Sequence, residues 1–393
     1  MSPRAGSVIR VTITHFRHEV ADLGQERRKG FDTVYRPGEQ WERHGAIVSI
    51  ETDAGLRGEA LSLSGVWEQS DLRGARYLLH RDPLDRAQIW FDLKRAARME
   101  MTVPPGGIDC ALWDLAGKFY EAPVYELLGG AWRTSLPSYA STFHGDVDGG
   151  LATPEDYAAF ALRCRDEHGY QAFKIHGWVG APIDQEIATV MAVREAVGAG
   201  MDLMIDPAGA YTTFADALRI GRACDEAGFF WLEDAFAAGS FSIAAHLRLR
   251  DRVRTPLLVG EHLRGFEAKA DAIRLGAADF IRASWFEDGG ITGVMKIAAL
   301  AEAFGVDVEL HGGGLAHRQC MAVLRNSNYF EVGLLHPNIA VTQTPLYEDP
   351  RWVDNLDAVD EHGCLAVPDG PGLGVDFDWA WIDDHTERVD VVE

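Results

Sequence analysis

The sequence has few cysteines, no long apolar run and too few basic residues to balance its acidic ones. The five cysteines are odd in number and far apart, at Cys110, Cys164, Cys224, Cys320 and Cys364. This spacing argues against a disulfide framework or a zinc cluster and is typical of a reducing compartment. No stretch approaches the ~18 apolar residues of a membrane span, and the first residues lack the apolar core of a signal peptide. We therefore expect a cytoplasmic protein without a membrane anchor.

The charge balance restricts the classes of partner. The chain has 37 Lys and Arg against 60 Asp and Glu, which gives a formal net charge of −23 over 393 residues. Such a charge repels phosphate backbones and anionic membranes, so we expect neither nucleic acid nor a membrane as a partner. An anionic small substrate is still compatible, because a site can be positive locally. The length fits two or three ordinary domains, or one large barrel with an accessory domain.

The N-terminal third predicts a small α+β domain. Residues 8–14 alternate between apolar and polar like an edge strand, and residues 45–52 predict a second strand that runs into a tight turn. The polar stretch 15–38 predicts a long loop, of the kind that forms a mobile lid. Apolar residues at spacings of three and four predict helices within 66–128. We assign this domain to residues 1–131.

From residue 132 the sequence repeats a short β-branched or aromatic run, which ends in a polar residue, followed by a helical stretch rich in Gly and Ala. Eight strands are predicted, at 135–142, 171–176, 202–206, 229–233, 256–261, 278–284, 306–311 and 329–333. The alternation favours a closed (β/α) barrel over residues 132–362, and no G-x-G-x-x-G motif opens the first βα turn as in a dinucleotide fold. The segment 363–393 is turn-rich and then strand-like up to residue 382, and we expect it to pack on the N-terminal domain.

Acidic residues end three consecutive predicted strands. Asp206 ends the third strand, Glu233 the fourth and Glu261 the fifth. Catalytic groups in a barrel lie at the C-terminal ends of its strands, and three converging carboxylates repel one another unless a cation lies between them. Ligation by oxygen alone favours Mg²⁺. The alternative is that each carboxylate only caps the helix that follows its strand.

Two histidines are candidate acid/base groups. The second strand ends in Lys174-Ile175-His176, and a period of two places Lys174 and His176 on one face. His311 ends the seventh strand, on the other side of the carboxylates. Neutral imidazole, with a reference pKa of about 6.5, accepts a proton at physiological pH. We expect the neighbouring Lys174 to lower the pKa of His176 and keep it free to act as a base.

Taken in order, the motifs FKIH, MIDPAGAY, WLEDAF, GEHL, GGITGVMKIAALAEAFG and PGLG resemble the mandelate racemase branch of the enolase superfamily. The resemblance covers nearly the whole chain. It implies an α/β fold with a (β/α)₇β TIM-like barrel and an N-terminal α+β capping domain that the C-terminal segment completes. It also implies Mg²⁺ as cofactor, removal of the proton α to a carboxylate, a small anionic sugar acid as substrate, and assembly as a homo-oligomer.

The resemblance implies roles for individual residues. It places metal ligands at Asp206, Glu233 and Glu261, catalytic residues at Lys174, His176 and His311, and substrate contacts at Lys174, Glu331 and the lid residue His18.

Among the departures from the pattern of the family, two concern the acid/base groups, and Ala208 and Ala235 stand beside metal ligands where Asn and Pro are usual. His176 stands where a second Lys is usual, and Ser284 aligns with the sixth-strand Asp that normally orients the seventh-strand His. Without that carboxylate, His311 loses an anionic partner that would raise its pKa and fix its tautomer. Glu287 or Asp288 can take its place only if the loop after the strand folds inward.

The sequence favours dehydration without excluding related reactions. In the favoured reaction, a base removes the C2 proton of a sugar acid, and His311, or His176 on the other face, protonates the departing 3-hydroxyl to give a 2-keto-3-deoxy acid. Acid/base groups on two faces also suit a racemase, an epimerase or a cycloisomerase. A hypothesis of another class is a barrel that binds a sugar acid without turnover.

Overall fold

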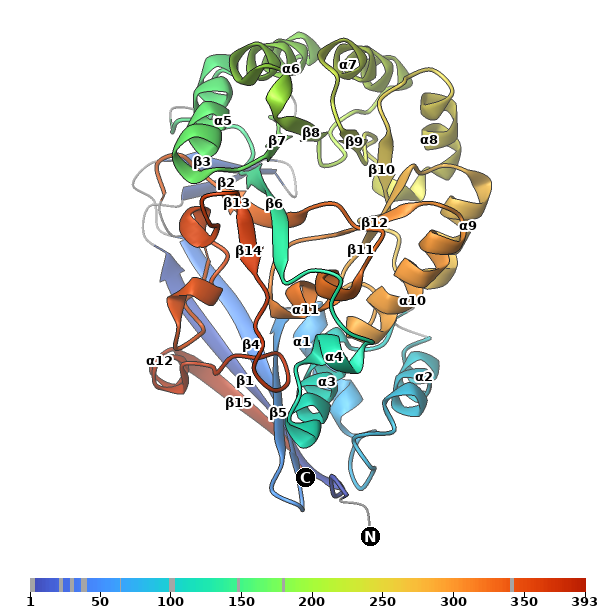
Figure 1. Cartoon of the computed structure of the whole chain (residues 1–393), viewed down its shortest axis with the longest axis vertical. Coiled ribbons are helices and arrows are strands. Elements are labelled where there is room, and N and C mark those ends of the chain that lie inside the picture. Colours follow the sequence, from blue (N-terminus) through green and yellow to red (C-terminus); the bar gives the residue numbers. More distant parts are fainter. Residues whose placement is uncertain are drawn as a thin grey trace.

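The computed structural model describes residues 4–20, 24–28, 32–36, 41–63, 65–98, 103–146, 149–178, 181–339 and 343–393. Figure 1 shows two parts, a curled sheet enclosed by an arch of helices and a smaller sheet with its own helices below it. We refer to them as the barrel and the cap.

The cap is a four-stranded antiparallel sheet flanked by helices. Its strand order is β15-β1-β4-β5, with bounds Thr386–Val392, Val8–Val20, Trp41–Thr52 and Arg57–Leu63. Its helices are α1 Val66–Ala75, α2 Arg86–Ala97, α3 Gly106–Tyr120 and the short α4 Val124–Leu127. The predicted strands at 8–14 and 45–52 are confirmed as parts of β1 and β4, which pair along their lengths.

The prediction of a loop over 15–38 is wrong for the described part of that segment. Strand β1 continues to Val20, because residues 15–20 pair with residues 41–46 of β4. Beyond it, β2 Gly24–Arg28 and β3 Asp32–Arg36 pair with each other as an antiparallel hairpin. These strands were not predicted, because charged residues interrupt the apolar/polar alternation by which a strand is recognised. Backbone pairing does not require that alternation. The rest of the segment lies outside the described residues. The action of residues 15–38 as a lid stays a prediction.

All eight predicted barrel strands are present, with ends shifted by no more than a few residues. They are β6 Ser135–Thr142, β7 Ala172–His176, β8 Asp202–Asp206, β9 Trp231–Glu233, β10 Leu257–Val259, β11 Phe280–Ala283, β12 Asp307–Leu310 and β13 Phe330–Leu335.

Among the residues that the structure describes, seven helices connect these strands and lie outside the sheet (Figure 1). They are α5 Pro154–His168, α6 Ile183–Val197, α7 Phe214–Ala227, α8 Ile243–Arg250, α9 Phe266–Leu275, α10 Gly290–Ala303 and α11 Leu315–Val323. Short 3₁₀ turns lie at Gly198–Gly200, Gly239–Phe241, Pro350–Trp352 and Leu356–Ala358. Across the described ranges, no helix has both the length and the apolarity needed to cross a membrane.

Parallel neighbours follow chain order from β6 to β12, and β13 returns to pair with β6. At the seam between β12 and β13 a side chain contributes to the closure. The buried carboxylate of Glu309 accepts hydrogen bonds from the backbone N–H groups of Asn328 at 3.1 Å and Tyr329 at 3.3 Å. The fold is therefore the expected (β/α)₇β barrel with an N-terminal cap.

The C-terminal segment differs in part from its prediction. Strand β14 Cys364–Ala366 pairs antiparallel with β6, but the expected strand-like end contains a helix, α12 Trp379–Asp384. The side chain of Asp378 accepts a hydrogen bond from the backbone N–H of Trp381, which caps the first turn of this helix. Strand β15 then joins the cap sheet beside β1. With this topology we propose to divide the chain after residues 131 and 362.

One buried carboxylate links three segments of the cap. Asp114 of α3 accepts hydrogen bonds from the backbone N–H groups of Glu59 and Leu373, both at 2.8 Å. Its third partner is the Lys118 ammonium, also at 2.8 Å. Because Glu59 belongs to β5 and Leu373 to the C-terminal segment, Asp114 ties that segment to the cap.

Replacing this carboxylate tests the link. In Asp114→Ala two buried N–H groups lose their acceptor, and we expect the free energy of unfolding to fall by about 2–5 kcal/mol. The exposed Asp383 supplies the control, since Asp383→Ala removes a solvated carboxylate and should change stability by no more than about 0.5 kcal/mol. Equilibrium urea unfolding measures both, and equal stability of the two variants would contradict the assignment.

Candidate metal centre and active site

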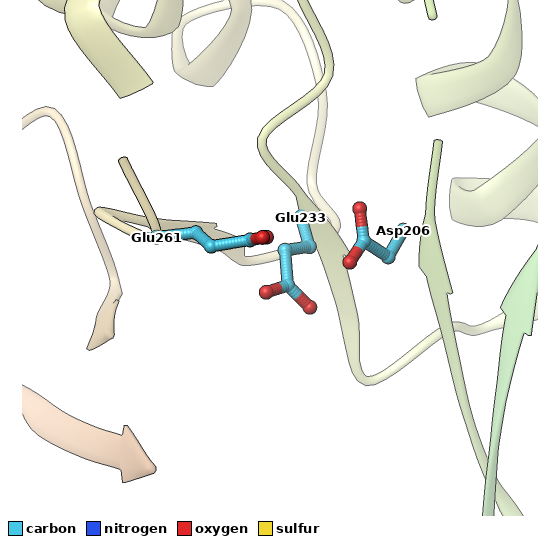
Figure 2. Close-up of side chains that lie close together, drawn as sticks. All are labelled: Asp206, Glu233 and Glu261. Carbon is cyan, nitrogen blue, oxygen red and sulfur yellow. The ribbon is translucent and has the colours of Figure 1, made fainter. Parts of the chain in front are cut away.

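Three carboxylates meet at one end of the barrel. Asp206 and Glu233 are the last residues of β8 and β9, and Glu261 follows the end of β10. Each offers an oxygen, and these oxygens all lie within 4.8 Å of one another. In Figure 2, Glu261 reaches in from one side and Asp206 from the other, with Glu233 between them. The structure thus brings together the three ligands that the sequence predicts.

Unusual backbone conformations follow two of these ligands. Ala208 has φ 47° and Asp234 has φ 29°, in a region that non-glycine residues rarely adopt. The turn at Ala208 lets its N–H donate to Oδ1 of Asp206 at 2.7 Å. The Asp234 carboxylate accepts from the N–H groups of Gly260 at 3.3 Å and Glu261 at 3.1 Å. These contacts fix the chain around the carboxylates, and such strain is common at functional sites.

Lys174 lies among the carboxylates. Its Nζ is 2.9 Å from Glu331, 3.1 Å from Glu233 and 3.4 Å from Asp206, and the residue is 1% exposed. Burial by itself would lower the pKa of Lys174, but the charges of Glu233 and Glu331 raise that pKa well above its ordinary value. The side chain is therefore an ammonium ion, which can stabilise an anion but cannot accept a proton.

His176 is buried beside Asp206 with its ring held on both sides. Its Nδ1 lies 2.7 Å from the carbonyl oxygen of Thr142, which can only accept, so we assign a proton to Nδ1. Its Nε2 lies 3.1 Å from Oδ2 of Asp206. An ionised carboxylate also only accepts, so Nε2 donates to Asp206 in this contact, and His176 can act as a base only once that proton has left.

Sequence reasoning missed Arg282, the fully buried arginine of β11. Its Nε and Nη2 donate to the two carboxylate oxygens of Glu233 at 2.5 and 2.7 Å, and its other donors reach the Leu310 carbonyl oxygen and the Tyr139 hydroxyl. Burial lowers its pKa, but Glu233 and other neighbours raise it well above the ordinary value. A basic residue within an apolar strand, FIRA, was the signal available in the sequence.

Glu331 of β13 is committed to partners inside the protein. One carboxylate oxygen faces Lys174, and the other accepts a hydrogen bond from the backbone N–H of Gly312 at 2.7 Å. Burial raises the pKa of Glu331, but Lys174 and Arg282 hold it well below its ordinary value. Both oxygens of Glu331 thus have partners within the protein, and a direct contact between Glu331 and substrate stays a prediction.

On the other side of the carboxylates, the His311 ring lies between two acidic side chains. Its Nε2 is 3.4 Å from Glu261, and its Nδ1 is 3.5 Å from Glu287. Burial lowers the pKa of His311, but these carboxylates raise it to about 9. The loop after β11 therefore folds inward and brings Glu287 to His311. Asp288 instead pairs with Lys269, at 2.6 Å.

A third imidazole, which the sequence did not single out, lies near His176. His144 follows β6, and its ring centroid is 5.1 Å from that of His176. Its Nδ1 is 3.2 Å from the carbonyl oxygen of Gly177. Burial and the neighbouring His176 lower its pKa to about 4, so His144 is neutral and can accept a hydrogen bond.

His18 lies in the cap. Its ring contacts those of Trp381 and His385 edge-on, with centroids 5.2 and 5.7 Å away. Its backbone pairs with Arg43 of β4, and the Arg43 guanidinium donates to Gln343 at 2.9 Å. A contact between His18 and substrate stays a prediction.

The donor set of the site suits a divalent cation. Lys174 and Arg282 both lie against Glu233, and Lys174 also reaches Asp206. The pKa of Glu261 is raised, mainly by burial, with further contributions from Asp206 and Glu233 that His311 only partly offsets. Three carboxylates whose oxygens lie within 4.8 Å of one another are the donors that a hard divalent cation prefers.

Comparison with known families covers most of the chain. A family model described as "Enolase C-terminal domain-like" matches residues 156–381. A second, described as "Mandelate racemase / muconate lactonizing enzyme, N-terminal domain", matches residues 39–129.

Individual proteins are similar over nearly the full length. D-galactarolactone cycloisomerase of Agrobacterium fabrum is 31% identical, with 84% of this chain and 88% of that protein covered. D-mannonate dehydratase of Sphingomonas sp. is 29% identical, with 86% and 90% covered. The crystal structure of D-glucarate dehydratase from Agrobacterium tumefaciens, complexed with magnesium, superposes with a TM-score of 0.81 at 30% identity and covers 97% of this chain and 99% of that one.

Two arginine–glutamate pairs test how far the site depends on Arg282. Arg282→Met leaves Glu233 buried without its bidentate partner, and we expect the free energy of unfolding to fall by about 3–5 kcal/mol. Arg325→Met breaks a pair with Glu302 at the surface, where the arginine side chain is 60% exposed, and should cost about 0–1 kcal/mol. Equilibrium denaturation compares the two, and a cost for Arg282→Met as small as the surface value would disprove the dependence.

Proposed function

The chain belongs to the enolase superfamily, in its mandelate racemase branch, and on this basis we propose that it is a Mg²⁺-dependent sugar-acid dehydratase. The observation that carries the proposal is the arrangement of three converging carboxylates with His176 on one side and His311 on the other. Relatives named as sugar-acid dehydratases support it, as does the magnesium complex of the similar glucarate dehydratase.

Asp206, Glu233 and Glu261 are the residues that would hold Mg²⁺. The ion would supply Lewis-acid stabilisation of the negative charge that develops on the substrate carboxylate. Lys174 adds a fixed positive charge beside these ligands, in a buried place where such a charge acts strongly. The ion and Lys174 would thus offer positive charges to an anionic substrate inside an acidic protein.

The imidazoles of His176 and His311 transfer the two protons of the proposed reaction. His176 presents Nε2 and, in its neutral form, accepts the C2 proton of the substrate. His311, on the other side, donates a proton to the 3-hydroxyl as the C3–O bond breaks. One molecule of water leaves, and the enol product converts to a 2-keto-3-deoxy acid. His144 is placed to accept a hydrogen bond from a substrate hydroxyl.

Cycloisomerisation is the second candidate. It is favoured by the relative with 31% identity, which is named a D-galactarolactone cycloisomerase. The same base would remove the proton α to the carboxylate, but His311 would protonate a ring oxygen that stays within the product. The two reactions differ in mass balance, because only dehydration loses water.

Three wider features are part of the proposal. The five free cysteines support a reducing compartment such as the cytoplasm. Neither nucleic acid nor a membrane is needed for the reaction, since the substrate is a small sugar acid. We also propose that the chain assembles as a homo-oligomer, as its family resemblance implies.

Metal binding tests the ligand set without substrate. Glu261→Gln keeps the size of the side chain and removes a charged ligand, and we expect Mg²⁺ to bind at least about tenfold more weakly. Glu267→Gln, at an exposed carboxylate of α9, is the matched control and should bind Mg²⁺ like the parent protein. Isothermal titration with MgCl₂ measures both. An unchanged Kd in Glu261→Gln would refute the proposed centre.

Turnover in D₂O separates the candidate reactions. The Mg²⁺-loaded enzyme is incubated with a library of aldonic acids, aldaric acids and their lactones. Dehydration gives a 2-keto acid that has lost one water, and cycloisomerisation gives a 2-keto isomer that has lost none; both take up a solvent deuterium at C3 as the enol becomes the ketone. Epimerisation gives the C2 epimer with deuterium at C2. Replacing the base in His176→Asn should slow the reaction by about 10²–10⁴-fold. Full turnover in that variant would refute the role of His176, and silence across the library would favour a barrel that only binds.

A further inference from the structure

We propose that Glu287 is a positioning residue, which orients His311 for proton transfer in place of the carboxylate that the sixth barrel strand lacks. The reaction it serves rests on the proposed function, whereas the orientation itself rests on the contacts of the chain.

The first argument is the pairing of two buried atoms. Nδ1 of His311 and Oε2 of Glu287 lie 3.5 Å apart, a charge contact longer than a normal hydrogen bond, and neither atom has a hydrogen-bond partner among the described residues. The opposite ring nitrogen, Nε2, faces Glu261 at 3.4 Å. A carboxylate beside Nδ1 holds the proton there and turns Nε2 toward the metal ligands, where a substrate would lie.

The second argument is that Ser284 does not perform this task. It occupies the strand-end position, is 1% exposed, and its hydroxyl oxygen has no hydrogen-bond partner within the described part of the chain. Its backbone N–H instead donates to Oδ2 of Asp288 at 2.8 Å. A neutral hydroxyl without a contact to the ring cannot supply the negative charge that orients an imidazole.

The third argument is that the loop holds Glu287 in place. The adjacent Asp288 is fully paired, because its carboxylate accepts from Lys269 Nζ at 2.6 Å and from the N–H of Gly265 at 3.0 Å. Its own N–H donates to the carbonyl oxygen of Ser284 at 2.9 Å, which closes the turn. Lys269 and Asp288 are both buried, so this anchor is shielded from water. The turn directs the preceding side chain, Glu287, toward His311.

The ring of Phe286 also packs beside the His311 imidazole. Its centroid lies 5.5 Å from that of His311, so the loop that supplies the carboxylate also supplies a wall for the imidazole. Glu287 itself is 5% exposed, and its pKa is lowered despite burial because of His311. It is therefore charged where it faces the ring.

The orientation is tested by NMR on the full Mg²⁺-loaded protein without substrate. With ¹⁵N-labelled histidine, the signal of His311 is assigned by its loss in His311→Asn. We expect a downfield Nδ1 proton that exchanges slowly with water, as a charge-assisted contact to Glu287 requires. In Glu287→Gln this proton should lose its downfield shift and exchange faster. Glu302→Gln, at a surface carboxylate, should leave it unchanged.

Rescue separates positioning from a merely structural role. Adding Ser284→Asp to Glu287→Gln returns a carboxylate to the strand end and should restore the Nδ1 signal. With any library acid that the parent enzyme turns over, Glu287→Gln should lower kcat about tenfold or more at similar KM, and the double variant should recover it. If Glu287→Gln does not fold, Glu287→Asp, which keeps the charge, gives the same readout with a weakened signal.

The outcomes are distinguishable from those of the proposed function. An unchanged Nδ1 signal in Glu287→Gln overturns the positioning role, whatever the enzyme does with sugar acids. Failure of the double variant to restore the signal overturns it as well. A signal that is lost and rescued supports it, even when no library acid reacts, in which case the proposed dehydration alone is refuted.

Discussion

The structure depends on the balance between buried negative charge and the groups that neutralise it at the open end of the barrel. Glu233 is fully buried and held by the fork of Arg282 on one side and by Lys174 on the other. Removing charges from water is unfavourable by several kcal/mol per ion, so each carboxylate needs partners with good geometry. The ion pairs fix the inner part of the site rigidly, while Glu261 at its rim has the His311 imidazole as its neighbour.

This balance also explains which parts of the site could be predicted from the sequence. A strand buried on both faces carries polar residues only where function or pairing requires them, so Asp206, Glu233, Lys174 and His176 stand out at the ends of apolar runs. Arg282 was equally visible but was overlooked, because a strand pattern does not tell whether a basic residue faces a carboxylate or the solvent.

Loops were harder to predict than strands. The inward fold of the chain from Ser284 to Asp288 depends on an ion pair with Lys269, a residue of the preceding helix. No local pattern encodes that partner, so the sequence could only offer Glu287 and Asp288 as alternatives. The hairpin of β2 and β3 was missed for a related reason, since backbone pairing holds together two strands in which five of the ten residues are charged. The helix α12 depends on a single capping aspartate.

The pairing of β1 with β15 sets an order of events during synthesis. Val11 pairs with Val392, so the backbone groups on one edge of β1 stay unpaired until strand β15 has been synthesised. The barrel strands emerge earlier and can pair as they appear, whereas the cap sheet is completed last. An open strand edge is a site where chains associate wrongly. Polar and charged side chains along β1, among them Arg10, His15 and Arg17, disfavour association of other chains with this unpaired edge.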